Sequence, residues 1–222
     1  MIKIAPSVLA ADPMRMGAEV DRMIKAGADW IHVDIMDGNF VPNLSYGPSL
    51  VKALKKETTL PLDVHLMILH PEKFIETFAK AGADVLTVHQ EVEAPLSELL
   101  KSIHARGIQA GVSVKPATRV ETLIPHLGDI DLVLIMTVEP GFGGQAFMPE
   151  MIEKIRVLRK MGYQGDIEVD GGVGPDNAGL LMESGATALV MGTALFTASD
   201  PKGAVQTIRA MGKGLHEAEK HG

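Results

Sequence analysis

The strand that decides the fold reads Trp30-Ile31-His32-Val33-Asp34-Ile35-Met36-Asp37-Gly38. Apolar and polar side chains alternate along it with the two-residue period of a β-strand. One face carries isoleucine and valine, and the other carries an imidazole, a carboxylate and a thioether. A strand buried on both faces is normally apolar on both, and buried polar groups are costly unless they are paired or bound to a metal. Taken alone, the stretch allows either a structural His–Asp pair or a functional site.

The flanking sequence repeats one unit, in which a short apolar run is followed by an amphipathic stretch. The predicted strands are residues 2–7, 30–38, 62–67, 84–88, 108–114, 132–136, 167–170 and 188–191. The predicted helices are residues 12–25, 49–56, 70–80, 95–105, 117–126, 149–160, 175–183 and a last one that starts at 200. Regular alternation of this kind indicates a parallel sheet of the α/β class. Eight units in a chain of 222 residues predict a single-domain (βα)8 TIM barrel.

Glycines mark the helix ends in this pattern. Gly27, Gly82 and Gly185 each stand where a helix would stop before the next strand. No shift of composition or linker divides the chain, so we expect one barrel domain over residues 1–213. Residues 214–222 are polar and are expected to form a frayed tail.

The overall composition excludes several classes of function. The net charge of -7 gives no general attraction to nucleic acid or to an anionic membrane. The absence of cysteine removes disulfides, thiolate metal sites and cysteine nucleophiles. No apolar run is long enough for a signal peptide or a membrane span. We therefore expect a cytoplasmic protein with no nucleic-acid partner and no membrane partner.

Polar residues gather at the predicted C-terminal ends of the strands, where barrels of this kind have their active sites. Two histidines and two carboxylates reach this rim from three strands, and they are His32, Asp34, His65 and Asp170. Ser7 ends the first strand beside them. Such a set matches the nitrogen and oxygen ligands of a divalent metal site. The alternative is four residues that are each satisfied separately within the structure.

Glycines form a second group in the loops after strands six, seven and eight. They are Gly141, Gly143 and Gly144, then Gly171 and Gly172, and finally Gly192, which precedes Thr193. Glycine lets backbone N–H groups approach an oxyanion closely, and the last loops of this fold commonly bind phosphate. Residues 141–144 alone would read as a mobile turn, but three such loops together predict a phosphate site.

Methionines and two further residues complete the list of candidates near the rim. Met36 and Met67 follow Asp34 and His65 on the same strand faces, and Met136 ends the sixth strand. Core filling is the commoner role of methionine, but these three positions suit an apolar lining for a substrate. His89 also reaches the site region, although the metal set is complete without it. Lys115 ends the fifth strand, where a Schiff-base lysine could act.

Several motifs resemble the ribulose-phosphate 3-epimerase family over residues 2 to about 200. They are residues 5–12, the opening stretch extended to Asn43, residues 63–67, residues 136–145 and residues 167–173. The resemblance implies a (βα)8 barrel that interconverts D-ribulose 5-phosphate and D-xylulose 5-phosphate through a 2,3-enediolate. It further implies a homo-oligomer, either a dimer or a hexamer.

The resemblance also implies roles for individual residues. One divalent ion (Fe²⁺, Zn²⁺, Mn²⁺ or Co²⁺) would be bound by His32, Asp34, His65 and Asp170, with Asp34 and Asp170 as the two acid/base groups. The implied substrate-binding residues are Ser7, His65, Met36, Met67, Met136, Gly141, Gly143, Gly144, Gly171, Gly172, Gly192 and Thr193. Three alternatives stay open, namely an epimerase acting on allulose 6-phosphate, an aldolase or decarboxylase that uses Lys115, and a non-catalytic phosphosugar-binding protein.

Overall fold

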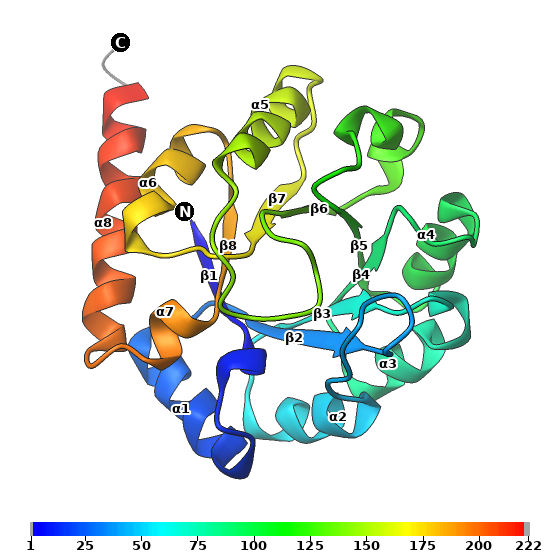
Figure 1. Cartoon of the computed structure of the whole chain (residues 1–222), viewed down its shortest axis with the longest axis horizontal. Coiled ribbons are helices and arrows are strands. Elements are labelled where there is room, and N and C mark those ends of the chain that lie inside the picture. Colours follow the sequence, from blue (N-terminus) through cyan, green and yellow to red (C-terminus); the bar gives the residue numbers. More distant parts are fainter. Residues whose placement is uncertain (1, 220–222) are drawn as a thin grey trace.

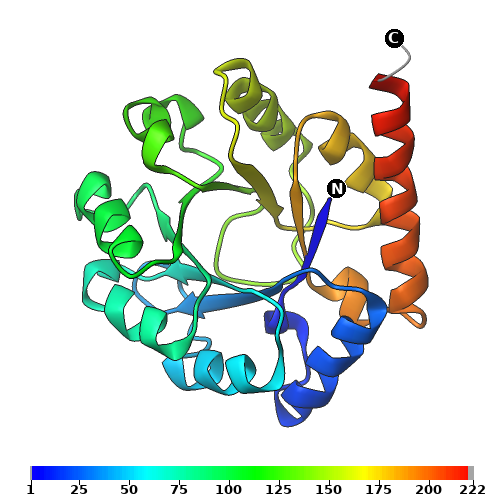
Figure 2. The ribbon, with the colours of Figure 1, turned by 180° about the vertical axis from the view of Figure 1, so that it is seen from behind.

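The computed structural model describes residues 2–219 as a ring of strands enclosed by helices (Figures 1 and 2). The strands are β1 (Lys3–Pro6), β2 (Ile31–Met36), β3 (Leu62–Met67), β4 (Val85–His89), β5 (Gln109–Val114), β6 (Leu132–Met136), β7 (Asp166–Asp170) and β8 (Ala188–Met191). The α-helices are α1 (Met16–Ala26), α2 (Pro48–Glu57), α3 (Ile75–Ala81), α4 (Leu96–His104), α5 (Ile152–Lys160), α6 (Pro175–Glu183), α7 (Thr193–Phe196) and α8 (Pro201–Glu219). Short 3-10 helices are η1 (Val8–Ala10), η2 (Pro13–Arg15), η3 (Pro71–Lys73), η4 (Val120–Asp129) and η5 (Pro149–Met151).

The strands form one parallel sheet that curls into a nearly closed barrel. Hydrogen-bonded neighbours follow the order β1-β8-β7-β6-β5-β4-β3-β2. The two end strands of this order meet at a bridge between Ser7 and His32. The predicted (βα)8 TIM barrel is therefore confirmed. Closure at this seam also sets Ser7 next to the polar face of β2.

The alternation along β2 sorts its side chains between two environments. Ile31, Val33 and Ile35 belong to the large apolar core in which strands and helices pack together. His32 and Asp34 take the opposite face, which points into the barrel, and both are buried there. The helices thus cover the apolar face of β2, and the barrel interior receives its polar face.

Helix ends follow the glycine pattern. Gly27 and Gly82 end α1 and α3 with positive φ values of 101° and 111°, a conformation that favours glycine over any residue with a Cβ atom. Helix α8 continues through Glu219, and thus into the segment predicted as a tail. The last three residues of that tail lie outside the described residues.

Two helical segments differ from the sequence-based prediction. The pattern predicts an α-helix over residues 117–126, but the structure has the 3-10 helix η4 at Val120–Asp129. Pro125 lies inside η4 and has no N–H to donate, which opposes a regular α-helix. Helix α7 directly follows β8 and was not predicted, because its 4 residues are too few to develop an amphipathic period.

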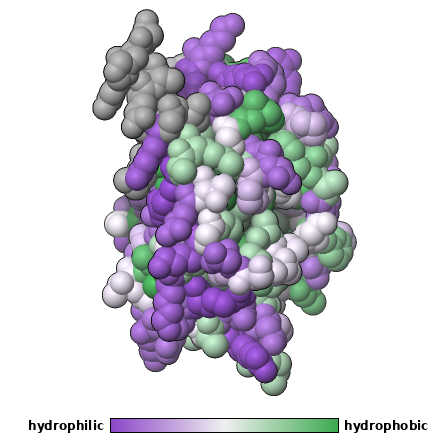
Figure 3. All heavy atoms as spheres, turned by 90° about the vertical axis from the view of Figure 1, so that its left-hand side faces the viewer, coloured by the Kyte–Doolittle hydropathy of each residue, from purple (hydrophilic) through white to green (hydrophobic). Residues whose placement is uncertain are grey.

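Among residues 2–219, no helix has both the length and the apolar character needed to cross a membrane. The face that lies at the left of Figure 1, over α8, shows hydrophilic residues interspersed among hydrophobic ones (Figure 3).

A contact between β4 and β5 yields a test of the barrel packing. A Cβ atom added at Gly111 would lie 2.1 Å from Thr87 Oγ1 and 3.2 Å from Thr87 Cα. We expect Gly111→Ala to lower the free energy of unfolding by about 1–3 kcal/mol, because overpacking forces neighbouring strands apart. Urea unfolding followed by circular dichroism measures the change. Gly128→Ala is the control, since an added Cβ there meets nothing within 4 Å. Equal stability of the two variants would contradict the packing.

Candidate active site

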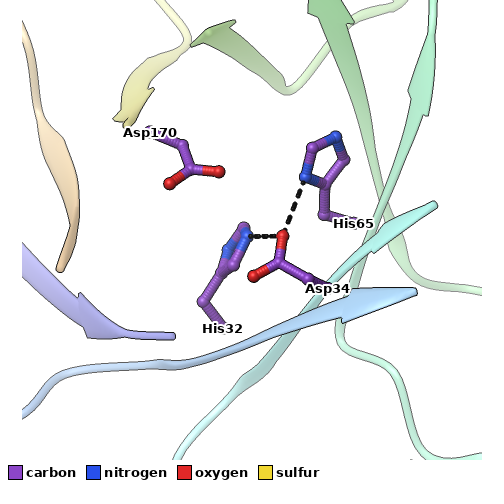
Figure 4. A group of neighbouring side chains, drawn as sticks. All are labelled: His32, Asp34, His65 and Asp170. Atoms are coloured by element: carbon purple, nitrogen blue, oxygen red, sulfur yellow. Dashed lines mark hydrogen bonds and ion pairs between the residues drawn. The ribbon is translucent and has the colours of Figure 1, made fainter. Parts of the chain in front are cut away.

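The four predicted metal ligands converge at one end of the barrel interior. His32 and Asp34 come from β2, His65 from β3 and Asp170 from β7, and their side chains point toward one another (Figure 4). One ligand atom from each lies within 4.8 Å of all the others. The β2–β3 register pairs Asp34 directly with His65, and residues 32 and 34 share a face because they are two apart. Local alternation and strand register together therefore build the cluster.

Asp34 is the centre of the cluster. Its Oδ1 lies 3.2 Å from His32 Nε2 and 3.3 Å from His65 Nδ1. Its Oδ2 accepts a hydrogen bond of 2.5 Å from the Ser7 hydroxyl. Burial raises the pKa of Asp34, but the nearby His32 and His65 lower it further, so the net pKa lies well below the usual range. Asp34 is thus held as a carboxylate with one oxygen toward the imidazoles and one toward Ser7.

Asp170 faces this group from the opposite wall and titrates in the other direction. Burial, followed by the charge of Asp34, raises the pKa of Asp170 to about 7. The two carboxylates therefore differ in their readiness to hold a proton, although they lie a few ångströms apart. Such a divergence between neighbouring acids is typical of acid/base sites.

Two buried carboxylates below the cluster were not found by the sequence analysis. Asp63 Oδ2 lies 2.5 Å from His32 Nδ1, and Glu168 Oε1 lies 3.9 Å from the same nitrogen. Burial lowers the pKa of His32, but Asp34 and Asp63 together raise it well above its ordinary value. Burial and then Asp63 raise the pKa of Glu168. Both acids stand two positions before a predicted ligand on the same strand, and that spacing was the available signal.

A second extension beyond the ligands starts at His65. Its Nε2 lies 2.8 Å from Nε2 of His89, whose Nδ1 lies 3.0 Å from Glu91 Oε2. Burial lowers the pKa of His89 to about 4. Burial raises the pKa of Glu91, but hydrogen bonds led by that from His89 lower it to about 2. The sequence placed His89 near the site without a role and did not single out Glu91.

The donor atoms of the cluster fit a divalent metal ion. His32, Asp34, His65 and Asp170 offer two imidazole nitrogens and two carboxylate oxygens, all aimed at one point. Borderline divalent ions favour this mixture of ligands, and an ion there would neutralise carboxylates that burial otherwise opposes. The residues therefore form a candidate metal site, and the donor set alone does not select one ion.

A cavity of about 570 Å³ opens from the cluster toward the loops at the C-terminal ends of the strands. Asp34 and Asp170 line it, and the predicted substrate-binding residues that line it are Ser7, Met36, Met67, Met136, Gly141, Gly143, Gly144, Gly171, Gly172, Gly192 and Thr193. His65 is fully buried behind this lining. The connection from β6 to α5 crosses the centre of the barrel in Figure 1. The structure thus brings the predicted metal and substrate residues to the same cavity.

The glycine-rich end of the cavity carries no cationic side chain. Its described lining contains neither lysine nor arginine. At Gly172, which has φ of +63°, an added Cβ would lie 2.7 Å from the backbone nitrogen of Phe147. The backbone segments after β6 and β7 therefore approach each other more closely than a side chain would allow. An anion at this end would meet main-chain dipoles and the N-terminal end of α6.

The raised pKa of Asp170 predicts how stability depends on pH without metal. The pKa of Asp170 in the folded protein, near 7, exceeds its pKa in the unfolded chain. The stability that this carboxyl contributes is therefore complete below pH ~4 and is lost as pH rises through about 7. In chelator-treated protein, we expect Asp170→Asn to gain about 1–2 kcal/mol over wild type between pH 5 and pH 8. Added divalent metal should reverse this order at pH 8. A difference independent of pH in urea unfolding would contradict the assignment.

The chain is similar to a known family and to several characterised proteins. The model of the "Ribulose-phosphate 3 epimerase family" matches residues 3–196. The cytoplasmic isoform of ribulose-phosphate 3-epimerase from Oryza sativa subsp. japonica is 48% identical, over 93% of this chain and 92% of the rice protein. The Bacillus subtilis (strain 168) ribulose-phosphate 3-epimerase is 47% identical, over 94% of this chain and 99% of its own.

A solved structure gives a more distant likeness. That of KGPDC from Streptococcus mutans has a TM-score of 0.74 and 15% identity, over 96% of this chain and 98% of that one. At this identity the match supports the barrel fold and says nothing about activity.

The family match over most of the chain, together with the two relatives, confirms the resemblance found in the motifs. The chain belongs to the ribulose-phosphate 3-epimerase family.

Proposed function

We propose that this chain interconverts D-ribulose 5-phosphate and D-xylulose 5-phosphate by inverting the configuration at C3. The observation that carries the proposal is the pair Asp34 and Asp170, which reach one end of the cavity from β2 and β7. Inversion needs a base on one face of the carbon and an acid on the other. Two carboxylates on opposite walls supply that arrangement.

The two oxygens of Asp34 allow it to have two functions. Oδ1 lies among the imidazole nitrogens, and Oδ2 is bound to the hydroxyl of Ser7. We assign Oδ1 to the metal site and Oδ2 to proton transfer at C3. Ser7 then keeps Oδ2 directed toward the cavity while the proton is absent.

One divalent ion would be held by His32, Asp34, His65 and Asp170, whose donor atoms suit Fe²⁺, Zn²⁺, Mn²⁺ and Co²⁺ alike. When bound, the ion supplies positive charge that stabilises the negative charge developing on the substrate's oxygens. Asp34 removes the C3 proton of one epimer, and the resulting 2,3-enediolate receives a proton from Asp170 on the other face. The reverse reaction exchanges the two roles. In the absence of metal, the pKa of Asp34 is lowered and that of Asp170 is raised, so the two carboxyls already differ in the direction of this division.

The rest of the cavity suits the remainder of a phosphosugar. Met36, Met67 and Met136 give an adaptable apolar wall around the reacting carbon. The glycine loops after β6, β7 and β8 would receive the phosphate through main-chain N–H groups. Because the described lining has no lysine or arginine, affinity for the anion would come from backbone dipoles and the metal.

The structure disfavours one alternative function, and experiments separate the others from the proposed one. Lys115 does not line the cavity, and its Nζ lies 3.9 Å from the centre of the Phe40 ring, so a Schiff-base aldolase is disfavoured. Borohydride trapping in the presence of substrate tests it directly. Allulose 6-phosphate differs from the proposed substrate by one carbon and is separated by comparing kcat/KM for the two sugars. A cytoplasmic location stays a prediction from the sequence composition, and a homo-oligomer, either a dimer or a hexamer, stays a prediction from the family resemblance.

Solvent exchange tests the proposed reaction. In D₂O with metal-replete protein, we expect deuterium at C3 of both pentulose phosphates, because each proton transfer passes through a carboxyl that exchanges with solvent. NMR of the recovered sugars measures the label. Chelator should abolish the incorporation, and added metal should restore it. Metal-replete protein that leaves C3 unlabelled would overturn the proposal, including its distinction from a non-catalytic binding protein.

The two carboxylates can be separated by paired variants. Asp170→Asn should lower epimerisation by about 10²- to 10⁴-fold, yet keep C3 exchange on the epimer whose hydrogen faces Asp34. Asp34→Asn should keep exchange only on the opposite epimer. Metal content is measured for both variants, since both residues belong to the candidate metal site. Exchange of the same epimer by both variants would contradict the two-base arrangement.

A further inference from the structure

A chain of hydrogen bonds leads away from the candidate metal site through the far side of His65. His65 Nδ1 faces Asp34 Oδ1 at 3.3 Å, while His65 Nε2 faces His89 Nε2 at 2.8 Å (Figure 4 shows the first of these contacts). His89 Nδ1 then faces Glu91 Oε2 at 3.0 Å. Glu91 Oε1 accepts the backbone N–H of Lys115 at 2.8 Å. His89 itself belongs to no group of potential metal ligands among the described residues.

The order of protons along this chain is fixed from its outer end. An ionised carboxylate can only accept hydrogen bonds, so Glu91 requires a proton on His89 Nδ1. A neutral His89 then has a bare Nε2, which must accept a proton from His65 Nε2. His65 then has Nδ1 bare, as a metal ligand requires, because an ion in the site would be shared by this nitrogen and by Asp34 Oδ1 in place of a hydrogen bond between them. With the opposite order, His65 would carry its proton on the very atom that has to bind the ion.

We propose that Glu91, acting through His89, is a positioning residue that selects the metal-binding nitrogen of His65. The proposal rests on the metal site of the proposed function and goes beyond it, because neither residue touches the ion or the substrate. His32 has an analogous partner, since its outward Nδ1 lies 2.5 Å from Asp63. Each imidazole ligand thus has a carboxylate on its far side, directly for His32 and through one further ring for His65. Partners of this kind fix the tautomer and orientation of metal-binding histidines.

Glu91→Gln is the sharpest test, because it keeps the shape of the side chain and changes only its hydrogen-bonding pattern. The amide oxygen of the variant can still accept the Lys115 N–H, which turns the amide NH₂ toward His89 Nδ1. His89 must then accept there and donate from Nε2, and His65 is left with its proton on Nδ1. The substitution should therefore reverse the whole order while the fold is retained.

The measurement is a titration of chelator-stripped protein with Co²⁺, followed by its visible absorption bands and a competing chelator. We expect the Co²⁺ affinity of Glu91→Gln to fall by about 10- to 100-fold. His89→Gln should stay close to wild type, because its amide can accept from His65 and donate to Glu91. Nitrogen-15 NMR of Zn²⁺-loaded protein should place the His89 proton on Nδ1 in wild type and on Nε2 in Glu91→Gln.

The matched control is Asp131→Asn, which makes the same carboxylate-to-amide change at a distant His–carboxylate pair. Asp131 Oδ2 lies 2.9 Å from His104 Nε2 and accepts the Ala110 N–H, and the variant should bind Co²⁺ like wild type. Unchanged affinity in Glu91→Gln, or an equal loss in His89→Gln, would overturn the proposal while leaving the proposed function intact. Wild-type protein that binds no Co²⁺ would overturn the metal site itself, and the proposal with it.

Discussion

The contact of one Asp34 oxygen with two imidazoles is the interaction on which the site depends. The contact with His32 depends on the alternation of side chains along β2, where the two residues are two apart. The contact with His65 depends on the β2–β3 register, which pairs Asp34 with His65. A slip of one residue would turn this polar face toward the helices and place Ile31, Val33 and Ile35 in the barrel. The apolar core around the barrel therefore opposes such a slip, since a slip of one residue would remove Ile31, Val33 and Ile35 from their packing against the helices.

The polar strand faces that form this site also place several ionisable groups in the barrel interior. Four carboxylates approach one another inside the nearly closed barrel, with His32 among them. They are Asp34, Asp63, Glu168 and Asp170. The structure responds in two ways, because the nearby His32 keeps the pKa of Asp34 low while burial raises the pKa values of Glu168 and Asp170. A divalent ion would relieve the remaining repulsion. The cost in stability and the proposed proton transfer thus have a common origin in the buried carboxylates.

Much of the fold could be predicted because its signals are local. The runs at β3, β6 and β8 coincide with the observed strands, and Gly27 and Gly82 end helices as expected. Helix η4 could not be predicted as a 3-10 helix from an amphipathic pattern alone, although Pro125 was a warning. Local periodicity indicates which face a side chain takes, and it does not reveal how a segment's hydrogen bonds are closed.

In the candidate site, too, local signals predict some residues, and the contacts of others depend on tertiary structure. His32, Asp34, His65 and Asp170 could be chosen from strand ends and alternation, and the structure brings them together. The contacts of Asp63 and His89 depend on the registers of β2 with β3 and of β3 with β4, which alternation does not give. Glu168 reaches His32 from β7, across the barrel, so its contact depends on barrel closure. Glu91 lies beyond the end of β4 in a loop, where no periodicity applies.

The end of β5 shows why one barrel can exclude the chemistry of another. A lysine at this position could form a Schiff base if its ammonium reached the cavity, but Lys115 lies against Phe40 instead. Its backbone N–H is bound to Glu91, whose other oxygen receives His89. The loop after β5 is fixed in turn by Lys154, whose ammonium donates to the carbonyls of Lys115 and Pro116. The rim position that could have supplied a nucleophile is therefore used to hold the outer end of a hydrogen-bonded chain that begins at His65.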